Sequence, residues 1–157
     1  LLASGSCDKT IRIWNLKTCE SITVLHSHTA MVTSVEFSPY CRGDTRWLVS
    51  SGSDANICFW KWNNRTLIFT PKPKKFIEKS GNNSSIVSLS FSSGGAFLVA
   101  GSTDCLIRVY YFDNEDPIRV AEIDSHSEIV DSILFSNNSS RFLSGSKDGS
   151  AKIWWYE

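Results

Sequence analysis

The sequence lacks the features that mark several large classes of protein. Its 16 basic and 16 acidic residues give a formal net charge of zero, so the chain as a whole is not drawn to nucleic acid or to a membrane surface. No apolar run approaches the ~20 residues that a membrane-spanning helix needs. Apolar residues also do not recur at the helical period of about 3.6 residues. The sequence therefore gives no support for a membrane-spanning or a helical protein.

Cysteine spacing gives no sign of a disulfide framework or a metal centre. The five cysteines are odd in number, scattered, and never spaced C-x-x-C; they are Cys7, Cys19, Cys41, Cys58 and Cys105. This usage is typical of a protein in a reducing compartment. We expect no metal site and no cofactor.

One signature occurs four times. A run of small residues leads into an aspartate, and an aromatic residue follows six positions later: Asp8 to Trp14, Asp54 to Trp60, Asp104 to Tyr110, and Asp148 to Trp154. The four aspartates are 46, 50 and 44 residues apart. An internal period of this size, with tight turns and terminal tryptophans, predicts the four-stranded blades of a β-propeller.

The second repeat shows the expected blade most completely. We expect strands over 32–37, 47–50 and 57–60, a tight turn at 53–56, and a fourth strand over 67–69. Pro71 and Pro73 disfavour a strand in the residues that follow, and 70–85 is expected to be one long irregular stretch. The first repeat lacks an opening strand and the fourth lacks an outermost strand. We therefore predict an all-β fold of about three and a half four-stranded antiparallel blades, cut from a larger propeller, with units at approximately 1–27, 28–81, 82–125 and 126–157.

Over its whole length the chain resembles WD-repeat propellers. In that family an opening His, a Ser or Thr, the turn Asp and the Trp form a buried tetrad in each blade. The matching residues here are His28, Ser50, Asp54 and Trp60 in the second unit, His126, Ser144, Asp148 and Trp154 in the fourth, and Ser4, Asp8 and Trp14 in the first. An indole N–H only donates a hydrogen bond, a hydroxyl both donates and accepts one, and a carboxylate only accepts. The four side chains can therefore satisfy one another's hydrogen-bonding groups.

The third unit departs from this pattern. Asn82, Ala100 and Tyr110 stand where His, Ser and Trp are expected. Because Ala100 offers no hydroxyl, we expect Tyr110 to have no tetrad partner and Tyr110→Phe to be milder than the corresponding changes at Trp60 and Trp154.

A narrower resemblance is to the bromodomain-and-WD-repeat proteins. It is carried by the segments 57–62, 71–73, 102–112 and 130–142, including Tyr at the third aromatic position and Trp-x-Trp in the second unit. The resemblance implies a nuclear, chromatin-associated scaffold involved in transcription regulation, with chromatin- or histone-linked protein partners. The alternative is a cytoplasmic WD-repeat scaffold in signalling, cytoskeleton organisation or trafficking.

An enzymatic interpretation is possible for His28, Ser50 and Asp54, which are the residue types of a hydrolase triad. However, no G-x-S-x-G motif is present, and the constellation occurs twice with a Trp at the same offset. Two identical structural locks explain that better than two active sites. We therefore predict that the chain is not an enzyme.

Partner contacts in WD propellers commonly lie at the rim of the central channel. The matching positions, here called the rim set, are Cys7, Met31, Thr33, Ser53, Ser85, Val87, Thr103, Ile129, Asp131 and Lys147. Several are apolar, which favours a protein partner; packing down the channel is the alternative. No sequence-specific nucleic-acid contact and no membrane partner is expected.

Three further segments carry weaker signals. Trp14-Asn15-Leu16-Lys17 resembles the W-D-x-R box that docks some WD proteins on the adaptor of a cullin–RING ubiquitin ligase, so Trp14 and Lys17 are candidate docking residues. Lys72, Lys74, Lys75 and Lys79 form a basic stretch that suits either an acidic partner or a solvated edge strand. Acidic residues between Asp113 and Asp131 form either one patch or two separate turns.

Overall fold

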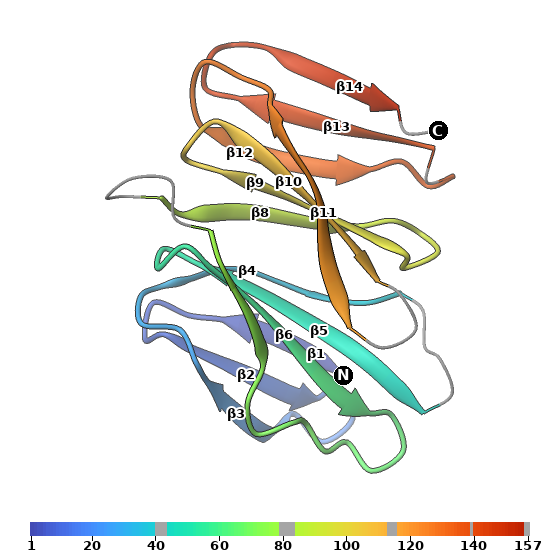
Figure 1. Ribbon diagram of the computed structural model, residues 1–157. Coiled ribbons are helices and arrows are strands. Elements are labelled where there is room, and N and C mark those ends of the chain that lie inside the picture. Colours follow the sequence, from blue (N-terminus) through green and yellow to red (C-terminus); the bar gives the residue numbers. More distant parts are fainter. Residues whose placement is uncertain (40–43, 79–83, 113–115, 139, 156–157) are drawn as a thin grey trace.

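The structure is a computed structural model that describes residues 1–39, 44–78, 84–112, 116–138 and 140–155. Within these ranges the chain forms strands and turns and no helix, so none of the described segments is a helix able to cross a membrane. Four antiparallel sheets follow one another through the molecule, from the blue N-terminal sheet to the red C-terminal sheet (Figure 1). The predicted all-β fold class is confirmed.

Each sheet is built from one continuous stretch of chain. The first contains β1 (Leu2–Gly5), β2 (Thr10–Asn15) and β3 (Glu20–His26). The second contains β4 (Val32–Phe37), β5 (Thr45–Gly52), β6 (Asn56–Asn63) and β7 (Lys74–Ile77). The third contains β8 (Ile86–Phe91), β9 (Phe97–Ser102), β10 (Leu106–Phe112) and β11 (Pro117–Asp124). The fourth contains β12 (Val130–Phe135), β13 (Arg141–Ser146) and β14 (Ala151–Trp155).

The two terminal sheets have three strands and the two central sheets have four. Among the described residues, the first sheet has no strand at the position of β4 and the fourth has none at the position of β7. This agrees with the expected missing opening strand of the first unit and the missing outermost strand of the fourth.

The predicted fourth strand of the second sheet was misplaced. Residues 67–69 contribute only an isolated bridge between Phe69 and Trp62, because Leu67 adopts a positive φ of 58° and turns the chain. The outermost strand is instead β7, which lies inside the stretch expected to be irregular. Pro71 and Pro73 precede β7 and so remove no hydrogen bond from its pairing with β6.

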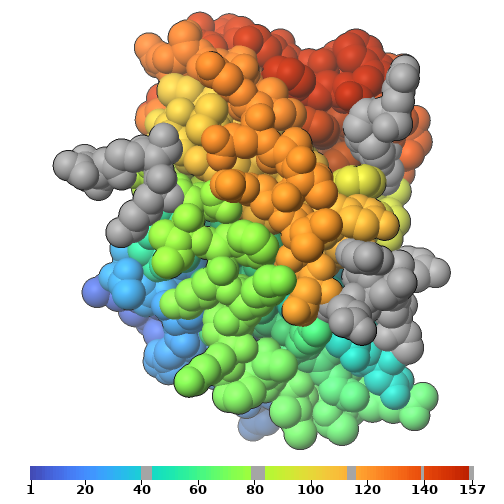
Figure 2. Space-filling view, viewed as in Figure 1, coloured from blue at the N-terminus to red at the C-terminus, as the bar shows by residue number. Residues whose placement is uncertain are grey.

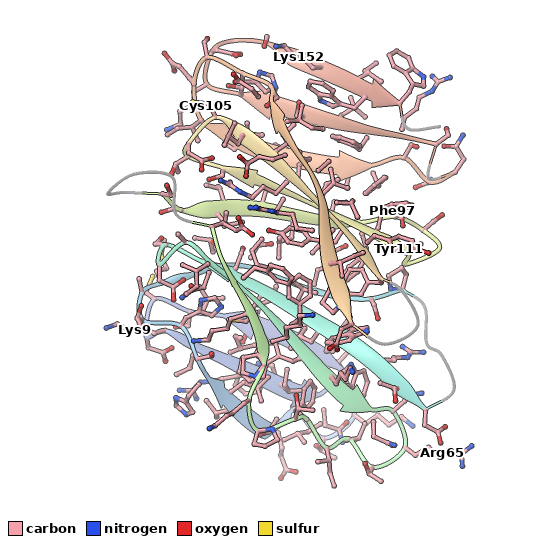
Figure 3. The ribbon with its side chains drawn as sticks, viewed as in Figure 1. Lys9, Arg65, Phe97, Cys105, Tyr111 and Lys152 are labelled. Carbon is pink, nitrogen blue, oxygen red and sulfur yellow. The ribbon has the colours of Figure 1, made fainter. Side chains whose placement is uncertain are left out.

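The four tight turns that contain the turn aspartates follow β1, β5, β9 and β13, and they share one geometry. The residue after each turn aspartate lies in the left-handed region, with φ between 60° and 80°, at Lys9, Ala55, Cys105 and Gly149. In each turn the aspartate accepts a hydrogen bond from the backbone N–H two residues later, as from Thr10 to Asp8 at 3.0 Å. Figure 3 shows Lys9 and Cys105 on one side of the stack and Phe97 and Tyr111 on the other. The predicted turns are therefore correct, and they gather on one side of the molecule.

The core lies between successive sheets. The face of the second sheet that carries Trp60 packs against Ile11 and Ile13 of the first sheet, and its opposite face packs, through Val49 and Phe59, against the third sheet. The fourth sheet packs its Phe142 face on the third sheet in the same way. The second, third and fourth sheets thus each present the face of their Trp or Tyr to the preceding sheet, which fixes the direction of the array.

The innermost strands are joined by side chains that bond to the backbone of the next sheet. The hydroxyl of Ser88 accepts from the N–H of Ile133 at 3.2 Å, and that of Ser90 accepts from the N–H of Phe135 at 3.0 Å. Glu36 makes the equivalent bond between the second and third sheets, accepting from the N–H of Phe91 at 3.2 Å. These bonds hold β4, β8 and β12 side by side as the inner wall of the array.

Candidate functional site

The tetrad of the second unit is assembled as the sequence predicts. Trp60 Nε1 donates to Ser50 Oγ at 3.1 Å, Ser50 Oγ lies 2.9 Å from His28 Nε2, and His28 Nδ1 lies 3.0 Å from Asp54 Oδ1. The side chain of His28 is fully buried and that of Asp54 is 4% exposed. Burial alone would raise the pKa of Asp54, but hydrogen bonds from the Thr29 N–H and from His28 outweigh it and lower the pKa.

The fourth unit repeats this arrangement and the first retains a portion of it. Trp154 donates to Ser144 at 2.9 Å, and His126 joins Ser144 at 2.8 Å to Asp148 at 2.9 Å. In the first unit, Trp14 Nε1 donates to Ser4 Oγ at 2.9 Å. The aspartate of that unit, Asp8, accepts instead from the backbone and hydroxyl of Thr10.

The geometry of the second tetrad does not suit a hydrolase. Ser50 is fully buried, and its hydroxyl already accepts from Trp60 while bonding to His28. A nucleophile must reach its substrate, and this hydroxyl is enclosed by the core. The buried thiol of Cys58 is no better as a nucleophile, because burial raises its pKa to about 11. The four side chains of the tetrad therefore form a structural hydrogen-bond network.

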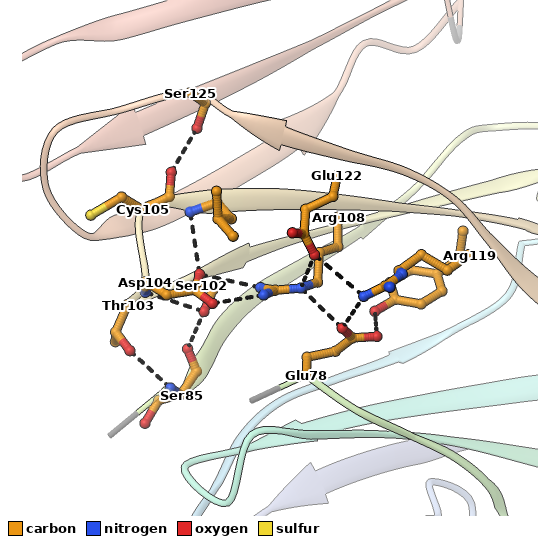
Figure 4. A network of polar contacts seen from close by, with 12 residues as sticks. Glu78, Ser85, Ser102, Thr103, Asp104, Cys105, Arg108, Arg119, Glu122 and Ser125 are labelled. Atoms are coloured by element: carbon orange, nitrogen blue, oxygen red, sulfur yellow. Dashed lines mark hydrogen bonds and ion pairs between the residues drawn. The ribbon is translucent and has the colours of Figure 1, made fainter. Parts of the chain in front are cut away.

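In the third unit a cluster of charged residues replaces the tetrad, as Figure 4 shows. This charge cluster consists of Glu78, Asp104, Arg108, Tyr110, Arg119 and Glu122. Arg108 is 2% exposed and its Nη2 lies 2.7 Å from Asp104 Oδ2. Its Nε lies 3.0 Å from Glu78 Oε2 as an ion pair that forms no hydrogen bond. Burial alone would lower the pKa of Arg108, but the neighbouring carboxylates, Asp104 first, raise it.

Tyr110 has no tetrad hydroxyl as a partner, as expected from Ala100, but the cluster supplies a different acceptor that was not expected. The hydroxyl of Tyr110 donates to Glu78 Oε1 at 2.8 Å in a fully buried site. Glu78 comes from the end of the second sheet, and its second oxygen accepts from Arg119 Nη1 at 2.6 Å. The tyrosine therefore has a charged acceptor in place of the serine that Ala100 removes. Asn82, the expected counterpart of the tetrad histidine, lies outside the described residues.

Sequence reasoning missed Glu78, Arg108, Arg119 and Glu122. One available signal was Arg108, a charged residue in an otherwise apolar strand, four positions after the turn aspartate. The replacement of the tetrad Ser and Trp by Ala100 and Tyr110 in the third unit was another, because a buried aspartate then needs a different cation or donor. Glu78 carried no comparable signal, since it follows β7 in a segment that was not expected to form a strand.

The rim set lies where the tight turns meet the loops that lead into the innermost strands. The residue before the turn aspartate donates its N–H to the loop in three sheets: Ser53 to the carbonyl of Met31 at 2.9 Å, Thr103 to Ser85 at 3.0 Å, and Lys147 to Ile129 at 3.0 Å. The structure thus brings these six residues together in pairs along one edge. Cys7 joins them from the first sheet, with its sulfur 3.3 Å from Met31 Sδ.

Members of the rim set differ in what they offer a partner. Met31 is 42% exposed, and Asp131 and Lys147 are also exposed, whereas Ile129 and Val87 are half-buried. The hydroxyl of Thr33 donates to the carbonyl of Ile86. The hydroxyl of Thr103 accepts from the N–H of Ser85. The two threonines therefore also serve the internal bonding of the rim.

The box at 14–17 contains the last two residues of β2 and the first two of the turn that follows. Asn15 Oδ1 accepts from the N–H of Lys17 at 2.9 Å, and the carbonyl of Asn15 accepts from Cys19 at 2.8 Å. Lys17 is exposed and Trp14 is half-buried. Asn15 therefore acts as a turn residue, and the Lys17 side chain extends from the surface of that turn.

The basic and acidic stretches are only partly covered by the described residues. Lys74 and Lys75 lie on β7, an edge strand of the second sheet, as the edge-strand interpretation requires. Asp116 pairs with Lys61 at 3.0 Å, next to the loop between β10 and β11. Glu128 lies beside the fourth turn, where its carbonyl accepts from Ser146. Lys79 and the residues 113–115 lie outside the described ranges.

The sequence of this chain matches the family model described as WD domain, G-beta repeat, over residues 1–15, 19–61, 72–111 and 117–154. The chain therefore belongs to the WD-repeat family, whose domains mediate protein–protein interactions.

Three curated relatives align with nearly the whole chain. It is 28% identical to Protein SPA1-RELATED 3 of Arabidopsis thaliana over 98% of its length and 17% of the relative. It is 29% identical to WD repeat-containing protein 91 homolog of Dictyostelium discoideum over 98% of its length and 19% of the relative. It is 30% identical to WD repeat-containing protein VIP3 of Arabidopsis thaliana over 91% of its length and 44% of the relative. The chain thus spans less than half of each relative. None of the three is named as a bromodomain protein, so the narrower resemblance stays a prediction.

Proposed function

We propose that this chain belongs to a non-enzymatic interaction scaffold in a nuclear, chromatin-associated WD-repeat protein, and that partners bind at the rim set. The observation that carries the proposal is that, in each of three repeat units, a backbone hydrogen bond joins two residues of the rim set. A surface fixed in this way loses little conformational entropy when a partner binds. The tetrads and the charge cluster beneath it keep the strands in register.

The chemistry of the rim favours a protein partner with both apolar and charged side chains. Met31 and Cys7 form a soft, exposed sulfur-containing surface at one end. Asp131 and Lys147 supply charges of both signs at the other end. Mixed apolar and charged contacts are typical of protein interfaces, and this combination favours a protein partner over bare nucleic acid.

The test is a pull-down from nuclear extract with the tagged chain and with the triple variant Met31→Ala, Val87→Ala and Asp131→Asn. We expect the variant to lose most specific partners while its melting temperature stays nearly unchanged, since these side chains carry little of the core. The matched control carries three exposed changes away from the rim and from the 14–17 box, namely Ile153→Ala, Val24→Ala and Glu20→Gln. Retention of every partner by the rim variant would reject the rim assignment.

The cellular site is tested separately. A protein detected only in the cytoplasm would reject the chromatin role and support a scaffold in signalling, cytoskeleton organisation or trafficking. The nuclear role rests on the resemblance to bromodomain-and-WD-repeat proteins, so the presence of bromodomains in the same protein would support it further.

Ligase docking through Trp14 and Lys17 is a second proposed role. Its support is that Lys17 is exposed on a turn whose shape is held by Asn15. Lys17→Glu should abolish co-purification of a cullin–RING ligase adaptor, whereas Lys9→Glu, another exposed lysine in a turn, should leave it unchanged. Equal recovery with both variants would reject this role.

A further inference from the structure

Each contact between successive sheets joins two kinds of face. The face that carries the Trp or Tyr of a repeat, here called the rear face, packs on the preceding sheet, and the other face, here called the front face, packs on the following sheet. Among the described residues, no sheet covers the rear face of the first sheet or the front face of the fourth. Figure 2 shows these blue and red sheets at the two ends of the molecule. We propose that the two uncovered faces bind one another in a second copy of the chain, so that two copies join head to tail.

The front face of the fourth sheet exposes apolar side chains at repeat positions that are buried in other sheets. Leu143 lies five residues before its turn aspartate and is 43% exposed, whereas Val49 and Val99 at the same position are 0% exposed. Ile153 lies five residues after that aspartate and is 49% exposed, whereas Phe59 at the same position is 1% exposed. The second and third sheets bury these positions against the sheet that follows them, and the fourth sheet leaves them open to a partner.

These side chains form one apolar strip across the fourth sheet. Leu134 stands directly opposite Leu143, and Leu143 stands directly opposite Ile153, on β12, β13 and β14. Residues opposed in this way share a face of the sheet. Leu134 is itself 63% exposed. A contiguous apolar patch of this kind on a protein surface marks an interaction site.

The outer end of this front face repeats an arrangement that contacts the next sheet elsewhere. In the second sheet, Trp47 stands opposite Lys61, whose Nζ lies 5.1 Å from the centre of the ring. The same ring packs 5.9 Å from that of Phe112 in the third sheet. In the fourth sheet, Arg141 stands opposite Trp155 and lies 5.4 Å from the centre of that ring. Trp155 is 64% exposed, so most of its surface is available to a further sheet.

The rear face of the first sheet shows the complementary pattern. Leu2 lies six residues before its turn aspartate and is 49% exposed, whereas Leu48 and Leu98 at the same position are 0% exposed. Leu2 stands opposite Trp14 in the register of β1 and β2. Trp14 is half-buried, whereas Trp60 at the same position is 1% exposed. The second and third sheets bury these positions against the sheet that precedes them.

A second copy supplies the kind of face that each end lacks. In all three contacts between described sheets, a front face meets a rear face and never a face of its own kind. The fourth sheet of one copy therefore continues the array when it packs on the first sheet of another. Each copy contains four sheets, so two copies joined at both ends contain twice four, or eight, sheets. Propellers close with about four to eight blades, and a head-to-tail contact that closes gives a ring.

The joint between copies differs from the internal contacts in one respect. Within the described ranges the first sheet lacks a strand at the position of β4. It therefore has no counterpart of the bond in which Ser90 accepts from the N–H of Phe135. The joint depends instead on apolar burial, which salt screens little. A further sheet of the same repeat on either side of residues 1–157 would occupy the same faces and so compete with the joint.

The test is sedimentation velocity of the full chain, in which dimer should replace monomer as the protein concentration rises. Leu143→Glu places a charge in the front face and Leu2→Glu places one in the rear face. Each should raise the concentration needed for half-association at least about tenfold. Ile118→Glu is the matched control and should leave association unchanged, because Ile118 is as exposed as Leu2, at 49%, but lies on β11 of the third sheet. Melting temperatures of dilute samples should agree, because every changed side chain is exposed.

A mixture of the two variants distinguishes head-to-tail joining from other modes. One front face and one rear face stay intact in the mixture, so a heterodimer with a single joint should form at concentrations where neither variant associates alone. A dimer that Leu143→Glu abolishes and Leu2→Glu leaves unchanged would join two front faces, and that result overturns the proposal. A chain that stays monomeric at every concentration, or a mixture that fails to associate, overturns it as well. Met31 and Val87 of the rim set belong to the two central units, so the rim is tested independently of the joint.

Discussion

Tyr110→Phe should destabilise the chain by about 2 kcal/mol. The hydroxyl is fully buried and donates to Glu78 Oε1 at 2.8 Å. A hydrogen bond to a charged group contributes about 1.5–3 kcal/mol, because its loss leaves the charged acceptor short of a donor. The phenyl ring fills nearly the same space, so the packing against Phe59 and Phe76 is kept. The loss should match that of Trp60→Phe rather than be smaller.

The assay is equilibrium unfolding in urea at pH 7. The slope of the unfolding free energy against urea concentration should be the same for all variants, so that a shift in midpoint reports stability alone. Tyr111→Phe is the matched control, because Tyr111 is the next residue and its ring packs on Phe97 at 5.1 Å. Tyr111→Phe should change the free energy of unfolding by no more than about 0.5 kcal/mol. A double-mutant cycle with Glu78→Gln should give a coupling energy of about 1–2 kcal/mol for the Tyr110–Glu78 pair.

A pH series gives an independent check. Burial, and then the charge of Glu78, raise the pKa of Tyr110. A raised pKa in the folded state means that this contribution to stability is complete below the unfolded value of about 10 and declines as the pH rises above it. The phenylalanine variant lacks this decline. A Tyr110→Phe effect as small as that of Tyr111→Phe, with no coupling to Glu78, would refute the role given to the charge cluster.

Three other outcomes are expected. Trp60→Phe should cost about 1–3 kcal/mol in urea unfolding, because it orphans the buried hydroxyl of Ser50; a neutral effect would contradict the lock. Gly52→Ala should lower the melting temperature by several degrees, since its Cβ would lie 2.7 Å from tetrad atoms, whereas Gly94→Ala meets no atom within 4 Å and should be neutral. Burial raises the pKa of Glu36, so its contribution is present below the unfolded value of about 4.3 and is lost as the pH rises. Glu36→Gln should therefore raise stability at pH 7 but not at pH 4, and the same gain at both values would contradict this reasoning.

Much of the fold could be predicted because each repeat carries the same short-range signals. The turn at Asp54 is local, since the carboxylate bonds to the N–H of Asn56, and the strand that carries Trp60 follows at a fixed distance. The fourth strand of the second sheet could not be located in this way. Whether 67–69 or 74–77 pairs with β6 depends on the positive φ of Leu67 and on the packing of Phe76 against the next sheet.

The site was predictable only where its chemistry stays within one repeat. His28, Ser50 and Asp54 belong to one unit, so a sequence pattern finds them. Glu78 and Arg108 come from different units. Their meeting at 3.0 Å depends on how two sheets pack, and no spacing in the sequence encodes that.

The charge cluster also limits how the units of this chain can be exchanged. A unit locked by its own tetrad takes its polar partners with it when it is moved to another position or another protein. The third unit cannot do so, because Arg108 depends on Glu78, which is supplied by the second unit. Moving either unit alone would break the buried pair between Arg108 and Glu78, at a cost of about 3–5 kcal/mol. The second and third units therefore behave as one transferable module, and chimeric propellers should be joined before β4 or after β11, not between β7 and β8.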